Sequence, residues 1–330
     1  MTYASGGLIE ATDYNGFVST GATNINTIWG TGAADAGWGQ TALSTVSAGG
    51  TVTATNWASL VNTLSTMGSQ SNTLITSRTA PTSGQTISVL AAVATDISSI
   101  NTNRSNAAAV GTTSTTWTGS AAKTTTTGSG NTAWTITWTQ TVTFPSAAQA
   151  RYFFNAGGRI YITMNKSSTG LDSDADWNTF IGKIGTISFT GLGASKTLAG
   201  TAYTGTTRTG GTGGTQTTLS TATGFYSLVA GAAATTIVKI NDDLTVYTGD
   251  FVQITVALDA TSTILTFVTT WVSTARTGAG QNTQISGGTD TTSPFSAYGT
   301  APAVICRFVP PSTTYLTNSW GTPTVASSVA

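Results

Sequence analysis

The stretch NTAWTITWTQTVTF, residues 131–144, constrains the fold most, because large side chains alternate with threonine along most of its length. Threonine occupies every odd position from 135 to 143. A repeat of two residues is that of a β-strand, whose successive side chains point to opposite faces. We therefore expect a strand with one buried face and one threonine-covered face. The buried face would carry Trp134, Ile136, Trp138, Gln140, Val142 and Phe144.

Several later segments share this strand pattern and are separated by turns rich in Gly and Thr. They predict a mainly β protein, with a β-sandwich or jelly-roll-like domain over residues 111–330. Residues 111–131 and 200–224 are predicted to be long Gly/Thr loops. The other predicted strands are RIYITMN (159–165), GTISFTG (185–191), TTIVKIN (235–241), DFVQITVALD (250–259), STILTFVTTWV (262–272) and AVICRFV (303–309).

Composition separates an ordered β protein from a disordered Thr/Gly/Ser linker. Hydrophobic residues make up 39% of the 330 residues and aromatics 9%, which favours a packed core. Only 7% are charged, the net charge is +0 and there is no basic run, so we expect no nucleic-acid partner. No stretch has the ~20 apolar residues of a membrane helix, and the N-terminus has no secretory pattern. The single cysteine, Cys306, is predicted to be a buried structural thiol.

Residues 1–50 are predicted to form an irregular, Gly-rich arm. Its aromatic side chains Trp29 and Trp38 would be costly to leave in water, so we expect the arm to pack on another surface.

Residues 51–110 are predicted to hold a pair of helices. The first, from residue 55 to Gly68, has Thr53 or Thr55 as a candidate N-cap. The second covers residues 86–103 and has an apolar seam with steps of three and four. This seam has two interpretations, packing against the first helix or self-association on a threefold axis, and the second predicts a homo-oligomer, preferably a trimer. The seam consists of Leu90, Val93, Ile97 and Ile100.

The segment FPSAAQARYFFNAGGRIYIT, residues 144–163, combines several signals for a short connecting helix. Pro145 ends the preceding strand, Ser146 is a suitable N-cap, and Gly157 and Gly158 close the helix. The pair Phe153 and Phe154 is expected to turn inward while Arg151 stays at the surface. We therefore expect a helical plug between two strands, at one end of the sandwich.

The residue inventory leaves little room for catalysis. Without His, and with one Cys and one Glu, the chain cannot form a Ser-His-Asp triad, a Cys-His pair or a His-ligated metal site. The acidic run LDSDADWNTF fails the calcium-loop pattern, because Trp177 stands where Gly is needed and Lys183 where Glu is needed. We expect no catalytic residue, metal or cofactor. We expect the three acidic residues to cap a helix N-terminus, where negative charge is favourable: Asp172, Asp174 and Asp176. The alternatives are a bound cation or the carboxylate pair of a depolymerase.

Aromatic side chains could also bind a glycan by stacking. Trp117 is the candidate contact, with the 201–224 loop beside it as a possible binding element. Trp134 and Trp138 share one strand face, and we expect that face to be core or a subunit contact.

Two stretches resemble known proteins. GGLIEATDYNGFV, followed by INTIWGTGAADAGWGQTALSTVSAGGTVTATNWASLVNTL, is similar to the amino-terminal region of virion structural proteins of tailed bacteriophages, notably cyanophages. WTQTVTFPSAAQARYFFNAGGRIYI resembles a segment of tail-fibre-like proteins in the same group.

The resemblance implies a non-enzymatic virion component of the tail, neck or head decoration, made in the host cytoplasm. Its partners would be other virion proteins, and its mechanism would be docking and assembly, with the arm of residues 1–50 docking into pockets of a partner protein. The docking residues would be Tyr14, Phe17, Trp29 and Trp38, and Trp29 and Trp38 would be buried only in the complex. A host-recognition module that binds surface glycans is the alternative function.

Overall fold

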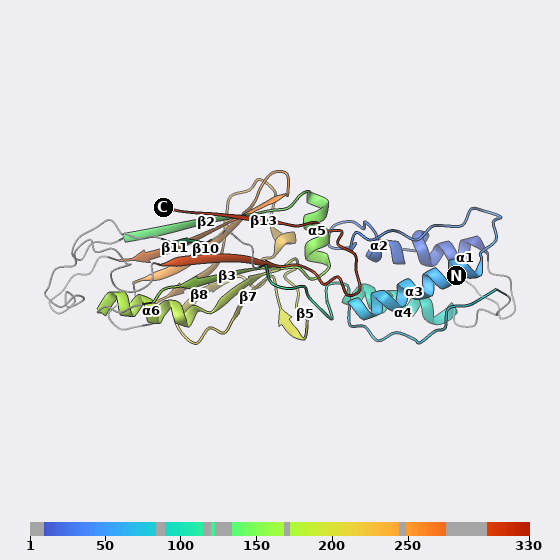
Figure 1. The fold of residues 1–330 in the computed structure, drawn as a ribbon, viewed down its shortest axis with the longest axis horizontal. Coiled ribbons are helices and arrows are strands. Elements are labelled where there is room, and N and C mark those ends of the chain that lie inside the picture. Colours follow the sequence, from blue (N-terminus) through green and yellow to red (C-terminus); the bar gives the residue numbers. More distant parts are fainter. Residues whose placement is uncertain are drawn as a thin grey trace.

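The molecule is elongated, with helices at one end and β-sheets at the other (Figure 1). The structure is a computed structural model, and it describes residues 10–83, 90–114, 120–122, 134–167, 172–243, 249–274 and 302–330. Antiparallel sheets account for most of the β region, so the prediction of a mainly β fold preceded by helices is confirmed.

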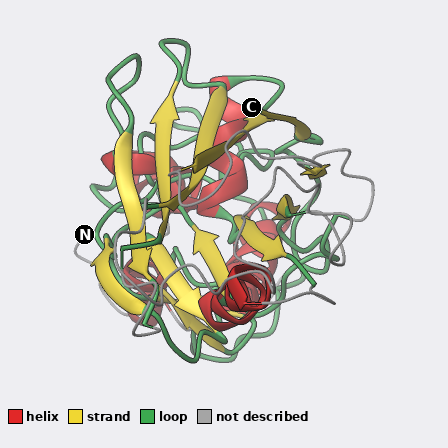
Figure 2. Ribbon diagram, turned by 90° about the vertical axis from the view of Figure 1, so that its left-hand side faces the viewer, coloured by secondary structure: helices red, strands yellow, loops and turns green. Residues whose placement is uncertain are grey.

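Among the described residues, the β region contains a five-stranded sheet, a six-stranded sheet and a small two-stranded hairpin. Neighbouring strands within each of them are antiparallel. Figure 2, viewed along the molecule, shows the strands around a central interior. The first sheet has the order β1 (Ser120–Ala122), β12 (Ala303–Val309), β3 (Arg159–Asn165), β4 (Thr186–Phe189), β7 (Thr206–Thr209). The second has the order β13 (Thr324–Val329), β2 (Trp134–Thr143), β11 (Ile264–Ser273), β10 (Phe251–Leu258), β9 (Thr235–Asn241), β8 (Thr215–Leu219). The hairpin pairs β5 (Lys196–Leu198) with β6 (Thr201–Tyr203).

Side chains of the two larger sheets meet face to face, as in a sandwich. The rings of Phe189 on β4 and Phe267 on β11 lie 5.3 Å apart. Gln140 on β2 is fully buried, and its Nε2 donates to the carbonyl oxygen of Val304 on β12 at 2.9 Å. The predicted inner face of β2 is confirmed for its described members, Ile136, Trp138, Gln140, Val142 and Phe144.

The structure contains strands that the sequence did not predict. Residues 200–224 are not one loop, because β6, β7 and β8 lie within them. β13 near the C-terminus was also missed. These strands are short or lie at a sheet edge, and their Thr, Ser and Ala residues give no apolar alternation from which to predict them. β8, for example, is largely exposed.

The arm is partly regular rather than irregular throughout. It forms α1 (Ala11–Asn15), a π-helical turn η1 (Gly16–Thr20) and α2 (Ile25–Trp29). A side-chain cap starts α2, where Asn24 Oδ1 accepts from the backbone N–H of Thr27 at 2.9 Å.

Two longer helices follow, α3 (Ala54–Gln70) and α4 (Leu90–Asn103). Thr53 is the N-cap of α3, and a reciprocal bond from Asn56 completes a capping box. The helix continues past Gly68, contrary to prediction. A side chain at Gly68 would meet the Thr73 carbonyl oxygen at 3.1 Å, so this glycine permits close packing of the returning chain.

The seam of α4 faces the interior of the same chain. Val93, Ile97 and Ile100 are each at most 1% exposed and belong to the core cluster that contains α3. The prediction that these three residues form an oligomer interface is therefore wrong, because the neighbouring helix already covers them. The side chain of Leu90 lies outside the described residues.

The predicted helical plug is α5 (Ala147–Asn155), and it connects β2 of one sheet to β3 of the other. Ser146 Oγ accepts from the backbone N–H of Gln149, and Gly157 has φ +98°, the left-handed conformation that follows many helix ends. Phe153 and Phe154 are buried among other aromatic rings. The plug prediction is confirmed.

Candidate functional site

Most of the predicted docking aromatics lie in the core of this chain. Tyr14, Phe17 and Trp38 are each 1% exposed. The rings of Tyr14 and Phe17 lie 5.8 and 6.1 Å from that of Trp57 on α3, so α3 is what these two side chains pack on. The prediction that a partner buries Tyr14, Phe17 and Trp38 is wrong. Trp29 stays partly exposed, with Nε1 donating to the Thr41 carbonyl oxygen.

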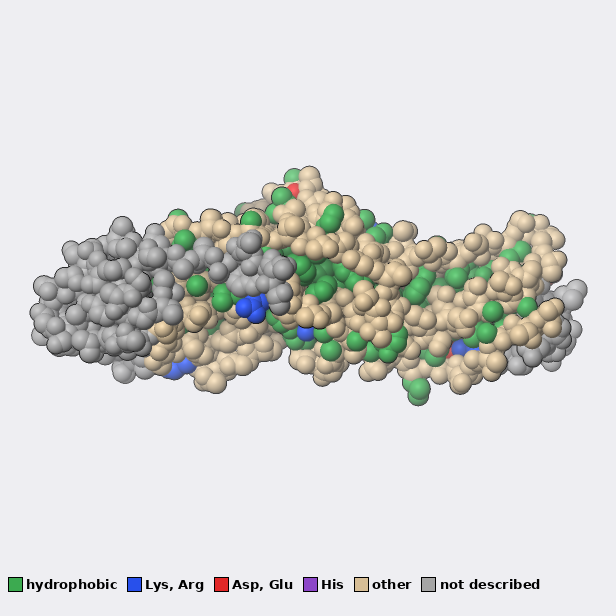
Figure 3. Space-filling model, in the orientation of Figure 1, with side chains coloured by type: hydrophobic (Ala, Val, Ile, Leu, Met, Phe, Trp, Pro, Cys, Tyr) green, Lys and Arg blue, Asp and Glu red, His purple; other side chains and the backbone are tan. Residues whose placement is uncertain are grey.

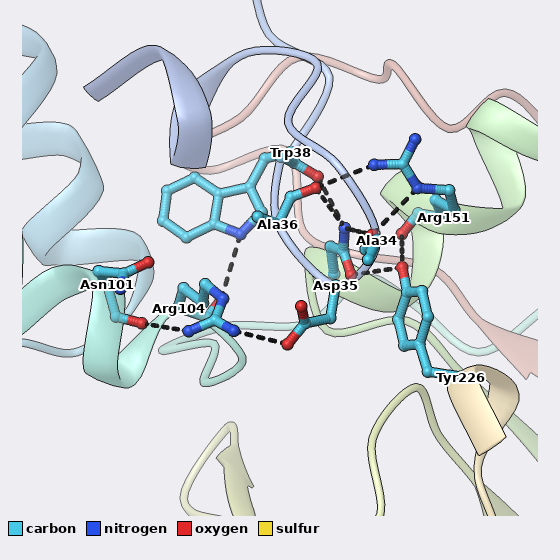
Figure 4. Close-up of polar contacts among 10 residues, drawn as sticks. Ala34, Asp35, Ala36, Trp38, Asn101, Arg104, Arg151 and Tyr226 are labelled. Atoms are coloured by element: carbon cyan, nitrogen blue, oxygen red, sulfur yellow. Dashed lines mark hydrogen bonds and ion pairs between the residues drawn. The ribbon is translucent and has the colours of Figure 1, made fainter. Parts of the chain in front are cut away.

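A loop of the arm, residues 31–37, lies on α5 (Figure 4). Arg151 stays partly exposed, as predicted, and it also binds this loop. Its Nε donates to the Ala34 carbonyl oxygen at 3.0 Å, and its Nη2 donates to the carbonyls of Gly32 and Ala36. One helical turn on, the Nδ2 of buried Asn155 donates to the carbonyls of Ala36 and Gly37, both at 3.0 Å. Arg151 and Asn155 of α5 thus donate hydrogen bonds to several backbone carbonyls of the arm.

Tyr226 supports this contact from the β region. Its hydroxyl donates to Asn155 Oδ1 at 2.7 Å, which fixes the orientation of that amide. Burial raises the pKa of Tyr226 above its ordinary value, so the hydroxyl stays protonated and can donate. η2 (Phe225–Ser227), a 3₁₀ turn, carries this tyrosine.

The end of α4 reaches the same loop. Arg104 pairs with Asp35 at 2.5 Å, and its Nη1 donates to the Asn101 carbonyl oxygen (Figure 4). Trp38 Nε1 donates to the Arg104 carbonyl oxygen at 3.2 Å. Both side chains of the ion pair are about a quarter exposed, so water screens their charges and the pair adds little stability. The hydrogen bonds to backbone carbonyls around it contribute more.

Gln40 joins the arm to the segment between β12 and β13. Its Oε1 accepts from the backbone N–H and hydroxyl of Thr317, at 2.8 and 2.7 Å. Its Nε2 donates to the carbonyls of Thr317 and Trp38, and Ser319 Oγ donates to the Trp38 carbonyl. The arm therefore lies between the plug and a C-terminal loop.

Together these residues form a junction between the helical end and the sandwich, which we call the collar: residues 31–40, Arg104, α5, Tyr226 and residues 317–319. Further bonds extend it, from Gln70 Nε2 at the end of α3 to the Ala156 carbonyl, and from Ala107 to β5. The contacts of the collar are mostly between side chains and backbone carbonyls. It can hold two parts of the molecule in one orientation, but it has no nucleophile paired with a base.

The acidic run forms the first turns of α6 (Asp172–Ile184). Negative charge is favourable there, which agrees with the prediction of a helix-terminal role. Asp176 is buried, and the side chains of Asp172 and Asp174 lie outside the described residues. Within the described ranges, no three His, Cys, Asp or Glu side chains form a group that could hold a metal ion.

Two reactive side chains are buried as parts of the framework. Cys306 is fully buried, as predicted, and burial raises its pKa to about 12, which leaves the thiol unreactive. Lys196 is 4% exposed, and its Nζ donates to Thr190 Oγ1 at 2.8 Å and to the Leu192 carbonyl at 2.6 Å. Burial lowers the pKa of Lys196 to about 8.

The predicted glycan contact, Trp117, lies outside the described residues, and Trp138 belongs to the core. A groove of about 490 Å³ opens where residues 110–112 meet the C-terminal loop. Its wall is uncharged and includes Phe308, Pro310, Asn318 and Thr322.

The collar was missed by sequence reasoning. Arg151, Asn155, Gln40 and Tyr226 act on backbone carbonyls, and such contacts leave no pairing pattern in a sequence. The one available signal was the polar pair Arg151 and Asn155, four residues apart on the predicted plug and therefore on one helix face.

Comparisons with known proteins return no match: no family model, curated protein or solved structure is significantly similar to this chain. In the part of the chain that the structure describes, no helix is long and apolar enough to span a membrane.

Proposed function

We propose that this chain is a non-enzymatic structural component of a bacteriophage virion, in the tail, neck or head decoration, that acts by docking and assembly. The observation that carries the proposal is the role of residues 144–163. This string, on which the resemblance to tail-fibre-like proteins rests, forms the plug and one wall of the collar.

The use of charge supports the same proposal. Ion pairs and cationic side chains connect elements that are distant in sequence: Arg78 on Asp96, Arg104 on Asp35, Lys183 on Asp243 and Arg208 on the carbonyls of residues 183 and 184. Such contacts stabilise one shape and present no chemistry to a substrate. A rigid, elongated protein that joins neighbours in a particle needs this property.

Purified particles provide the test. We expect mass spectrometry of virions, banded on a density gradient and produced from a phage genome that encodes this chain, to detect it in fixed ratio to the major capsid protein. Antibody labelling would then locate it on the tail, neck or head. Recovery of the chain only from the soluble lysate, and not from particles, would contradict the proposal.

The second candidate is a glycan-binding module for host recognition, and the uncharged groove beside Asn318 favours it. Amide and hydroxyl groups beside apolar rings suit a neutral saccharide. Binding of the purified protein to host cells, competed by free surface polysaccharide and reduced by Asn318→Ala, is the expected result. Equal binding by the Asn318→Ala protein would remove this groove from consideration.

A further inference from the structure

The outer face of the six-stranded sheet has no role in the fold described so far. We define the threonine face as the outward side chains of β2, β11 and β10. Their inward neighbours form the core, while the outward side chains remain partly or fully exposed. The members are Thr135, Thr137, Thr139, Thr141, Thr143, Phe251, Gln253, Thr255, Ala257, Ile264, Thr266, Val268, Thr270 and Val272.

The strand register sets outward side chains of the three strands side by side. Thr141 lies beside Thr266 and Thr137 beside Thr270, while Thr143 pairs with Ile264, Thr139 with Val268 and Thr135 with Val272. On the other side of β11, Val268 pairs with Thr255 and Thr266 with Ala257. Hydroxyl and aliphatic groups are therefore mixed across the whole face.

The threonine face carries no charge. Its fourteen positions contain neither an acid nor a base, and Lys239 of the neighbouring strand β9 lies at its margin, with Nζ 4.0 Å from the centroid of the Phe251 ring. Two copies of such a face can approach without like-charge repulsion. A charged partner would gain nothing from it.

The size of the face fits a weak, reversible dimer. With the uncharged edge strand β13 beside β2, four strands at about 4.8 Å spacing span about 19 Å, and strands of this length extend about 27 Å. The projected area is roughly 520 Å², close to the ~600 Å² that each partner buries at the lower end of specific interfaces. This area is too large for a single sugar ring.

We propose that the threonine face is a self-association surface, which packs against the same face of a second copy. Sheets stack about 10 Å apart with their strands within about 30° of each other, so β-branched side chains of both copies would meet. Under a twofold axis, the threonine and aliphatic side chains of one copy would meet the same set of side chains in the other. The inference rests on the sheet alone and not on the virion proposal.

The test is the mass of the full chain in solution, by sedimentation and light scattering over micromolar to sub-millimolar concentrations. We expect a reversible dimer, of about twice the 33.4 kDa of one chain. Thr139→Lys places like charges in the middle of the face and should weaken the dimer about 100-fold. Thr139→Val keeps the shape, removes a hydroxyl and should tighten it. Thr197→Lys, at an exposed position on β5, is the matched control and should have no effect.

Disulfide cross-linking provides a second test of the dimer, which does not depend on the folding of the Thr139→Lys protein. Thr139→Cys introduces the only accessible thiol among the described residues, because Cys306 is fully buried. Oxidation should give a covalent dimer from Thr139→Cys, or from the same change at Thr137 or Thr141, but not from Thr197→Cys. A monomer at every concentration, or a dimer that Thr139→Lys leaves intact, would overturn the proposal.

Discussion

The interior of the sandwich and the collar are held together by different physics. In the sandwich, aromatic rings fill the space between the sheets, as with Phe189 and Phe267, whose centroids lie 5.3 Å apart. In the collar, polar side chains such as Arg151 and Gln40 bind backbone carbonyls and amides of distant segments. The apolar core also reaches the collar through Trp38 and Phe153, but there directed hydrogen bonds orient the arm against the sandwich.

This difference predicts that substitutions of buried rings and of collar side chains should have different effects on stability. Loss of a buried ring leaves a cavity and weakens the whole cooperative unit. Loss of a collar side chain leaves carbonyls unpaired and loosens one contact, while the sandwich keeps its core. The predictions below test that division, from the largest expected effect to the smallest.

Phe153→Ala should destabilise the protein most. The ring is fully buried and contacts Phe144, Phe154 and Phe308, so its removal should cost about 3–5 kcal/mol. Chemical denaturation measures the change in unfolding free energy. Phe153→Leu is the control and should cost less than half as much; equal stability of the Ala variant and the natural protein would contradict the plug.

Lys196→Met tests whether a buried cation limits stability within the sandwich. The folded pKa, about 8, lies below the unfolded value of 10.5, so between these values the unfolded chain binds more protons and stability rises with pH. The span corresponds to about 3 kcal/mol at most. Denaturation at several pH values from 7.5 to 9.5 should show this rise for the natural protein and a flat profile for Lys196→Met. A rise that persists in the variant would assign the titration to another group.

Arg151→Ala should weaken the collar without unfolding the sandwich. Hydrogen bonds from a charged donor contribute about 2 kcal/mol, and here the 31–37 loop loses them. Hydrogen exchange by mass spectrometry should speed up in residues 31–37 and stay unchanged in β10 and β11. Arg208→Ala, which also removes a guanidinium from carbonyls but within the β region, is the matched control and should leave that loop unaffected.

Thr53→Ala should have the smallest effect, because it removes only the cap of α3. The loss is about 1 kcal/mol, and Thr53→Ser should restore most of it. Thermal unfolding is the measurement. A loss of stability as large as that of Phe153→Ala would contradict this, because it would mean that the whole helical end depends on the N-cap of α3.

The sequence allowed prediction of the parts of the fold that follow local periodicity. The alternation in residues 134–144 predicted β2 and its inner face, and Pro145, Ser146 and Gly157 predicted the limits of α5. The Thr-rich strands β6, β7 and β8 could not be predicted, because they lack an apolar face. Their pairing is set by other strands, since β6 pairs with β5, β7 with β4 and β8 with β9.

Long-range contacts explain the failures at the candidate site. Trp38 lies in a Gly-rich stretch with no period, so nothing local indicates that Arg104, far along the chain, covers it. The seam of α4 was compatible with either a neighbouring helix or another copy, and only the packing of α3 decides between them. The start of a helix at the acidic run Asp172, Asp174 and Asp176 could be predicted locally, since negative charge is favourable at a helix N-terminus.

The central claim is that the arm is docked within its own chain. Hydrogen exchange of residues 31–40 and of Thr317 in the isolated monomer tests this most directly, because the Thr317 amide donates to Gln40 Oε1 across the junction. The amides of Trp38, Gly39 and Gln40 donate to the carbonyls of residues 28–30 and report the fold of the arm itself. We predict that these amides exchange far more slowly than an unstructured peptide, with no partner protein present. Exchange at the rate of an unstructured peptide, slowed only after assembly with other proteins, would contradict the claim.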